Sequence, residues 1–199
     1  MSDIATAPAG STVSEPGPAP SAGLAPVRRS IKRWLWLFVV CLVLSGATAF
    51  PLQTETELLA RIVDATGLDS ALPAVDRWVH HVRTGVAAGY GSYPFLAYGT
   101  DWLAFAHLVI AAAFWGPLRD PVRNIWVVRW AMIACGGVIP LALICGPLRG
   151  IPVFWQFVDM SFGVVGVVPL LIVHRKIRRL EWEQALAAHH DFARVMPCP

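Results

Sequence analysis

Charge is scarce in this sequence. Only 15% of its 199 residues are charged, whereas soluble domains carry about 25%. The charges are separated by long uncharged runs, and 56% of all residues are apolar. This pattern excludes a soluble globular enzyme, a disordered regulator or a disulfide-stapled secreted domain as a description of the whole chain. The net charge of only +3 also argues against a basic nucleic-acid-binding protein, so no nucleic-acid partner is expected.

Catalytic and cofactor motifs are missing as well. The chain has no H-E-x-x-H, G-x-S-x-G, P-loop or G-x-G-x-x-G pattern. Neighbouring histidines on a helix point about 100° apart, so His80–His81 and His189–His190 do not predict a metal site. A haem bound by two histidines is disfavoured, because only His107 lies deep in an apolar run. The sequence therefore predicts no metal and indicates no particular cofactor.

The cysteines give no sign of a framework. Their positions show neither a C-x-x-C motif nor another paired spacing, and three of them lie in apolar runs, so we interpret them as small apolar residues. They are Cys41, Cys135, Cys145 and Cys198.

Four apolar runs are long enough to cross a membrane. A helix rises 1.5 Å per residue, so about 20 residues span a hydrocarbon core of about 30 Å. The predicted fold is all-α, an integral membrane four-helix bundle with a short amphipathic helical segment on its outer face. The predicted spans are about 34–53, 99–117, 125–147 and 152–173.

The first apolar run has a second interpretation. Basic residues, the core LWLFVVCLVL and then Ala47-Thr48-Ala49 resemble a secretory signal with its cleavage site. Residues 34–49 would then be removed instead of retained as an anchor. We expect a retained anchor, because a leader of this length would be unusual.

The segments outside the spans differ in character. Residues 1–32, ending in a basic cluster, are poor in large apolar residues and predict a disordered tail. Residues 54–97 predict two amphipathic helices, the first over 54–66 and the second from about Pro73, followed by an irregular stretch. Residues 174–199 predict a polar helix along the membrane surface and a frayed tail.

Local signals set the expected helix ends. Thr54 and Glu57 have the spacing of a capping box, and Gly67 supplies a stop. The tetrapeptide Gly-Pro-Leu-Arg occurs at 116–119 and 146–149, where we interpret it as the end of two helical hairpins. A duplicated functional motif is the alternative.

The Lys and Arg residues predict the orientation. They cluster before the first span, between the second and third, and after the fourth, whereas the segment between the first two spans has three basic and five acidic residues. The positive-inside rule then places both termini in the cytoplasm. The expected location is a bacterial-type inner membrane.

Four ionisable residues fall inside or at the edge of the predicted spans: Asp101, His107, Arg129 and Asp159. An unpaired charge in a membrane costs several kcal/mol, so each residue is a candidate for a site. Counted from the outer ends, His107 and Asp159 lie about 10–12 Å deep, at a matching level. We expect Arg129 to reach the headgroups or to pair with Asp120.

The candidate site is an outward-opening polar pocket beneath the 54–97 segment, in which His107 and Asp159 are the candidate catalytic pair. The alternative is a buried polar clasp between helices without chemistry, directly between His107 and Asp159 or through Gln156. Asp101 could instead form an ion pair with Arg149 at the outer surface. Tyrosines in the irregular stretch suit a water–lipid boundary or a lid. The predicted pocket residues are Tyr98, Asp101, His107, Gln156 and Asp159.

Three functions are compatible with this sequence. The first is a non-enzymatic subunit, scaffold or assembly factor of a membrane complex, with a membrane-protein partner or a second copy of the chain. The second is a membrane-embedded enzyme or carrier in which His107 and Asp159 transfer protons to a lipid-soluble substrate such as a quinone. The third is an oligomeric transporter, which four helices alone hardly provide. The absence of catalytic motifs favours the first.

Overall fold

A computed structural model describes residues 24–195, with side chains described as far as His189. Residues 1–23 of the predicted tail and residues 196–199, which include Cys198, lie outside this range. All regular elements in the described part are helices, which confirms the all-α prediction. They are α1 (Ala25–Ala49), α2 (Leu52–Thr66), α3 (Leu68–Ala71), α4 (Pro73–Ser92), η1 (Pro94–Leu96), α5 (Ala97–Ala113), α6 (Trp115–Arg119), α7 (Ile125–Leu148) and α8 (Val153–Val195).

Four helical segments are long and apolar enough to cross a membrane: Ala25–Ala49, Pro94–Arg119, Ile125–Leu148 and Val153–His189. Their surfaces are apolar too, with Ile133, Leu148 and Phe162 all largely exposed. Soluble proteins rarely expose large contiguous apolar patches. The four predicted spans are thus matched by four suitable helices, which supports a membrane-embedded protein.

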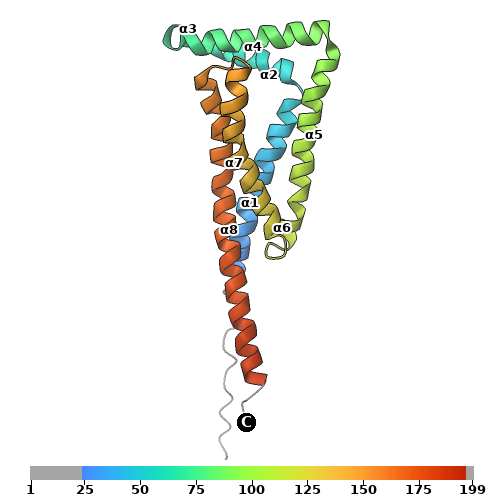
Figure 1. The fold of residues 1–199 in the computed structure, drawn as a ribbon, viewed down its shortest axis with the longest axis vertical. Helices are drawn as coiled ribbons and strands as arrows, with labels where there is room; N and C mark the ends of the chain where they lie inside the picture. The colour runs from blue at the N-terminus through green and yellow to red at the C-terminus, as the bar shows by residue number, and fades with distance from the viewer. Residues whose placement is uncertain (1–23, 196–199) are drawn as a thin grey trace, which may run out of the picture.

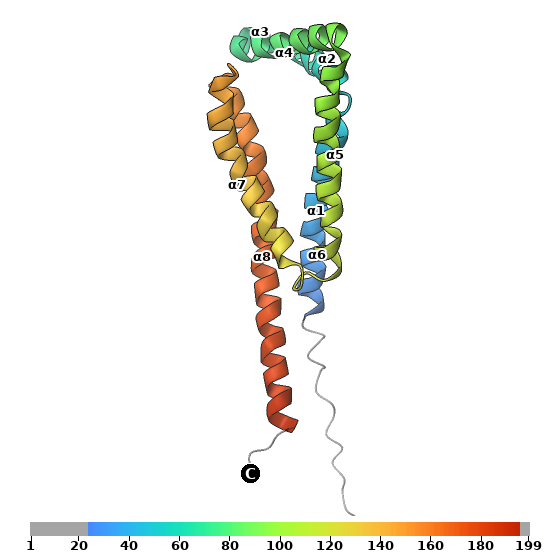
Figure 2. The ribbon, with the colours of Figure 1, turned by 45° about the vertical axis from the view of Figure 1, so that its right-hand side comes forward.

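The long helices form two pairs that meet at one end. α1 packs on α5, α7 packs on α8, and contact between α1 and α8 joins the pairs. The pairs diverge toward the other end (Figure 2). The main core lies where they meet, near α6 and the start of α1, and we call this the termini end. Its fully buried side chains include Ile31, Leu35, Phe114, Val128, Leu170, Val173, Ile177 and Leu180.

Helices α2, α3 and α4 lie crosswise over the diverging end (Figure 1) and form what we call the platform. α2 packs on α4 through Ala60, Val63 and Val79. Gly67 ends α2 as predicted, in a left-handed conformation with φ of 66°. The predicted capping box is wrong: α2 starts at Leu52, two residues before Thr54, and no side chain caps it.

The predicted irregular stretch before the second span is largely helical. α4 continues to Ser92, through Tyr90 and the glycines on either side of it. Only Tyr93 leaves the helical conformation (φ −138°, ψ 74°), because the α region is disfavoured for a residue before proline. After the short turn η1, α5 begins at Ala97.

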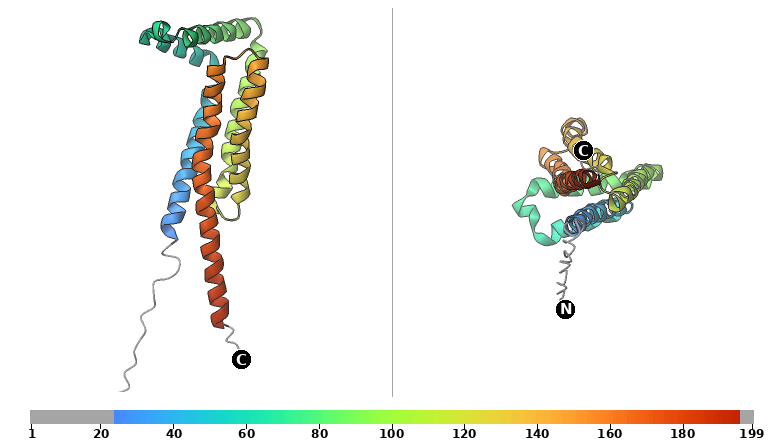
Figure 3. Two further views of the ribbon diagram at one scale, coloured as in Figure 1. Left: turned by 60° about the vertical axis from the view of Figure 1, so that its left-hand side comes forward. Right: turned by 90° about the horizontal axis from the view of Figure 1, so that it is seen from below.

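Helices α1 and α8 extend further than the spans predicted. α1 starts at Ala25, so the expected disordered tail is wrong for residues 25–32, where Ile31 is buried in the core. Beyond the fourth predicted span, α8 continues as a helix to Val195 and projects past the bundle (Figure 3).

The Gly-Pro-Leu-Arg tetrapeptides do not end helices at their glycines. Gly116 lies inside α6 and Gly146 inside α7. α7 is instead ended by Gly150 (φ 68°), where the amide of Ile151 donates to the carbonyl of Gly146 at 2.9 Å. This is a Schellman cap, so the stop signal was the later glycine.

Candidate functional site

His107 lies in the seam between α5 and α1. A Cβ placed on Gly46 of α1 would lie only 2.7 Å from the Cβ of His107, so glycine is what allows this approach. The ring Nδ1 lies 2.8 Å from the carbonyl oxygen of Leu103, one turn earlier on α5. The imidazole therefore forms its hydrogen bond within its own helix.

Gln156 faces α7 instead of the space between the helix pairs. It is only 4% exposed and packs against Gly146. Its side-chain amide donates to the carbonyl of Ile151 at 2.8 Å. Gln156 thus stabilises the α7–α8 turn, and this bond is not the expected bridge between His107 and Asp159.

Asp159 lies near the same face of α8, between Gln156 and Gly163, which both contact α7. The side chain is partly buried. No hydrogen bond or ion pair to the carboxylate occurs within residues 24–189, and the expected clasp with His107 is not formed. A carboxylate in an apolar helix is therefore left without a partner in the described part of the chain.

The remaining predicted pocket residues lie apart from this carboxylate. Tyr98 is 63% exposed, and its ring packs edge-on against Trp102 on α5 at 6.0 Å. Asp101 is partly buried, and across the described residues no ion pair joins it to Arg149. The contacts do not assemble the five residues into one cluster.

Arg129 has a partner that the sequence did not suggest. Its Nε donates to Nε2 of His174 on α8 at 3.4 Å. Asp120 instead accepts from the backbone amide of Arg123 at 3.1 Å, so the expected pairing of Arg129 with Asp120 is wrong. Arg129 contributes to the α7–α8 contact near the termini end.

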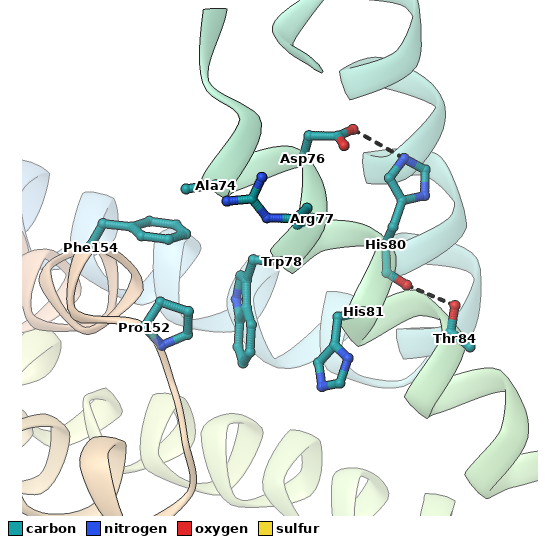
Figure 4. Close-up of a pocket in the computed structure, with 9 residues that line it drawn as sticks. All are labelled: Ala74, Asp76, Arg77, Trp78, His80, His81, Thr84, Pro152 and Phe154. Atoms are coloured by element: carbon teal, nitrogen blue, oxygen red, sulfur yellow. Dashed lines mark hydrogen bonds and ion pairs between the residues drawn. The ribbon is translucent and has the colours of Figure 1, made fainter. Parts of the chain in front are cut away.

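A hollow that the sequence did not indicate lies between the platform and the start of α8 (Figure 4). It is open and holds about 870 Å³. Trp78 lies on its wall, stacked on His81 at 5.7 Å and 6.4 Å from the ring of Trp155 on α8. The other lining residues are Ala74, Asp76, Arg77, His80, Thr84, Pro152 and Phe154.

Beside this hollow, two carboxylates meet one histidine. Nε2 of His80 lies 3.0 Å from Oδ1 of Asp64 on α2 and 3.3 Å from Oδ1 of Asp76 on α4. The four-residue spacing of Asp76 and His80 was visible in the sequence. Asp64, sixteen residues from His80, joins them only through the packing of α2 on α4.

No protein-family model matches the chain, and comparisons with curated proteins and with solved structures found no match.

Proposed function

We propose that the protein is a non-enzymatic subunit or assembly factor of a membrane complex, in which a helix of a second membrane protein packs along α8 beside Asp159. The observation that carries this proposal is the partnerless carboxylate of Asp159 in the described part of the chain. Burying an ionisable group in lipid is costly unless it is paired or hydrated. A donor on a neighbouring protein's helix would satisfy the carboxylate.

The open shape of the bundle supports the same proposal. The α1/α5 and α7/α8 pairs meet near the termini end and diverge toward the platform (Figure 2). The chain's own α5 packs mainly on α1, so this helix is not the partner that we propose for α8.

The described contacts favour a subunit over a membrane-embedded enzyme. Proton transfer between His107 and Asp159 would need the two groups joined by a hydrogen bond, directly or through an intermediary. Nδ1 of His107 is instead hydrogen-bonded to the carbonyl of Leu103, and the side-chain amide of Gln156 to the carbonyl of Ile151. The proposal therefore leaves both residues without a catalytic role.

We further propose that the termini end lies in the cytoplasm and the platform on the opposite side. The basic clusters belong to the start of α1, to α6 and the loop after it, and to the later part of α8. These segments lie toward the termini end (Figure 1), whereas the platform carries five acidic and three basic residues. This asymmetry agrees with the positive-inside rule. The clustered residues are Arg28, Arg29, Lys32, Arg33, Arg119, Arg123, Arg175, Lys176, Arg178 and Arg179.

Native gel electrophoresis of membranes solubilised in a mild detergent tests the proposal. The wild-type chain should migrate in a complex well above its own 21.7 kDa, and mass spectrometry should find a second protein at fixed stoichiometry. Asp159→Leu should abolish the complex without loss of inserted protein, because leucine suits lipid. The matched control, Asp101→Asn, should leave it intact. A wild-type monomer, or a complex indifferent to Asp159→Leu, would contradict the proposal.

A further inference from the structure

We propose that Asp64, Asp76 and His80 form a binding site for a divalent transition-metal ion of the zinc class on the platform. This inference is independent of the subunit role, because the three residues lie outside the four apolar helices. It also reverses the expectation from sequence that the chain binds no metal.

The fold holds the three side chains together from two helices. Asp76 and His80 are one turn apart on α4, so they project from the same face. Asp64 follows Val63, which is buried against Val79 of α4. The packing of α2 on α4 therefore fixes the third ligand opposite the first two.

The distances fit a small metal ion. The histidine nitrogen lies 3.0 Å and 3.3 Å from the two carboxylate oxygens, and one ligand atom from each residue falls within 4.8 Å of the others. A tetrahedral Zn²⁺ with ligands at 2.0–2.2 Å keeps its ligand atoms about 3.3–3.6 Å apart. The ligands need only small side-chain adjustments to bind such an ion.

The charges around the site also call for a cation. Within the described side chains, no Lys or Arg nitrogen lies within 4.0 Å of the carboxylates of Asp64 or Asp76. Nε2 of His80 carries at most one proton, so it donates one strong hydrogen bond and not two. A bound dication compensates both carboxylates and uses the lone pair of the neutral imidazole.

One imidazole and two carboxylates favour a particular class of metal ion. Imidazole together with carboxylates suits zinc and similar transition metals, whereas Ca²⁺ and Mg²⁺ need more oxygen ligands than these residues offer. Three protein ligands leave a fourth position open. Asp76 and His80 also line the hollow in Figure 4, so the site borders space for water or a small anionic ligand.

Zinc titration of the full-length, untagged protein in detergent tests the site. After removal of metal with a chelator, calorimetry should show one Zn²⁺ bound per chain, undisturbed by excess Mg²⁺. His80→Ala should weaken binding at least about tenfold, because loss of even a supporting group costs 10–100-fold. The matched control is His81→Ala, since His81 neighbours His80 but stacks on Trp78 instead of facing the carboxylates.

Asp64→Asn provides the second variant, because it keeps the side-chain shape and the α2–α4 packing. It should weaken Zn²⁺ binding while the thermal unfolding of the metal-free protein stays unchanged. The proposal is overturned if wild type shows no saturable Zn²⁺ binding, or if His80→Ala and Asp64→Asn bind as tightly as wild type. Equal loss in His81→Ala would also overturn it, since binding would then not depend on the three residues.

Discussion

The side-chain amide of Gln156 donates a hydrogen bond to the carbonyl of Ile151 at 2.8 Å, inside the turn that connects α7 to α8. The glutamine is buried against Gly146, while the backbone of Ile151 completes the cap of α7. One polar side chain in the apolar region thus has a structural role that the contacts explain completely. Asp159, one turn further along α8, has no such partner in the described residues.

Gln156→Leu should destabilise the protein. The substitution removes the donor to Ile151 and leaves a partly buried carbonyl without its side-chain partner, at a cost of about 1–3 kcal/mol. Thermal unfolding in detergent, followed by tryptophan fluorescence, measures the effect. Gln53→Leu replaces an exposed amide on α2 and should change the unfolding temperature much less. Equal effects of the two substitutions would refute the role given to Gln156.

Gly163→Ala should separate α7 from α8. A Cβ at Gly163 would collide with the backbone carbonyl oxygen of Cys135 and lie 3.2 Å from the Cβ of Val138. Overpacking of this kind costs about 1–3 kcal/mol. Gly136→Ala is the matched control on α7, because nothing lies within 4 Å of a Cβ there. The control should unfold at or slightly above the wild-type temperature, and a Gly163→Ala variant as stable as the control would contradict the close approach of the two helices.

Trp78 should respond differently to two substitutions. Its Nε1 is buried without a hydrogen-bond partner in the described residues, although the ring packs between His81 and Trp155. Trp78→Phe keeps an aromatic ring and removes the unsatisfied donor, so stability should change by less than about 1 kcal/mol. Trp78→Ala removes the ring and should cost about 3 kcal/mol. The same thermal assay separates the two, and equal losses would show that the indole N–H is bonded.

Cysteine labelling tests the proposed orientation. In a chain whose native cysteines are replaced, Ala71→Cys on the platform should react with a membrane-impermeant maleimide in intact cells. Ala185→Cys, on the projecting part of α8, should react only after lysis. Both alanines are exposed, so access differs only by the side of the membrane. The reverse pattern would contradict the orientation.

The sequence predicted the helices better than their contacts. Uncharged runs identify spans, because a helix in lipid must be apolar along its whole length. Helix ends were harder, since Gly116 and Gly146 looked like stops and only the backbone shows that Gly150 is the cap.

The candidate site shows the same limit. The equal estimated depth in the membrane suggested that His107 and Asp159 meet. Depth alone, however, does not fix how each helix is rotated about its own axis. Close approaches at Gly46 and Gly146 turn His107 toward α1 and Gln156 toward α7. The cluster on the platform depends on the packing of α2 on α4, which local sequence patterns do not encode.

The central claim is that another membrane protein covers the Asp159 face of α8, and site-specific photo-crosslinking in intact membranes tests it most directly. A photoreactive phenylalanine replaces Phe162, three residues from Asp159, or Phe157, which lies about 140° around the helix from Phe162. Both side chains are well exposed in the single chain, at 68% and 64%. The account predicts a protein adduct from position 162 and only lipid adducts from 157. Lipid adducts alone at 162, or equal protein adducts at both positions, would contradict it.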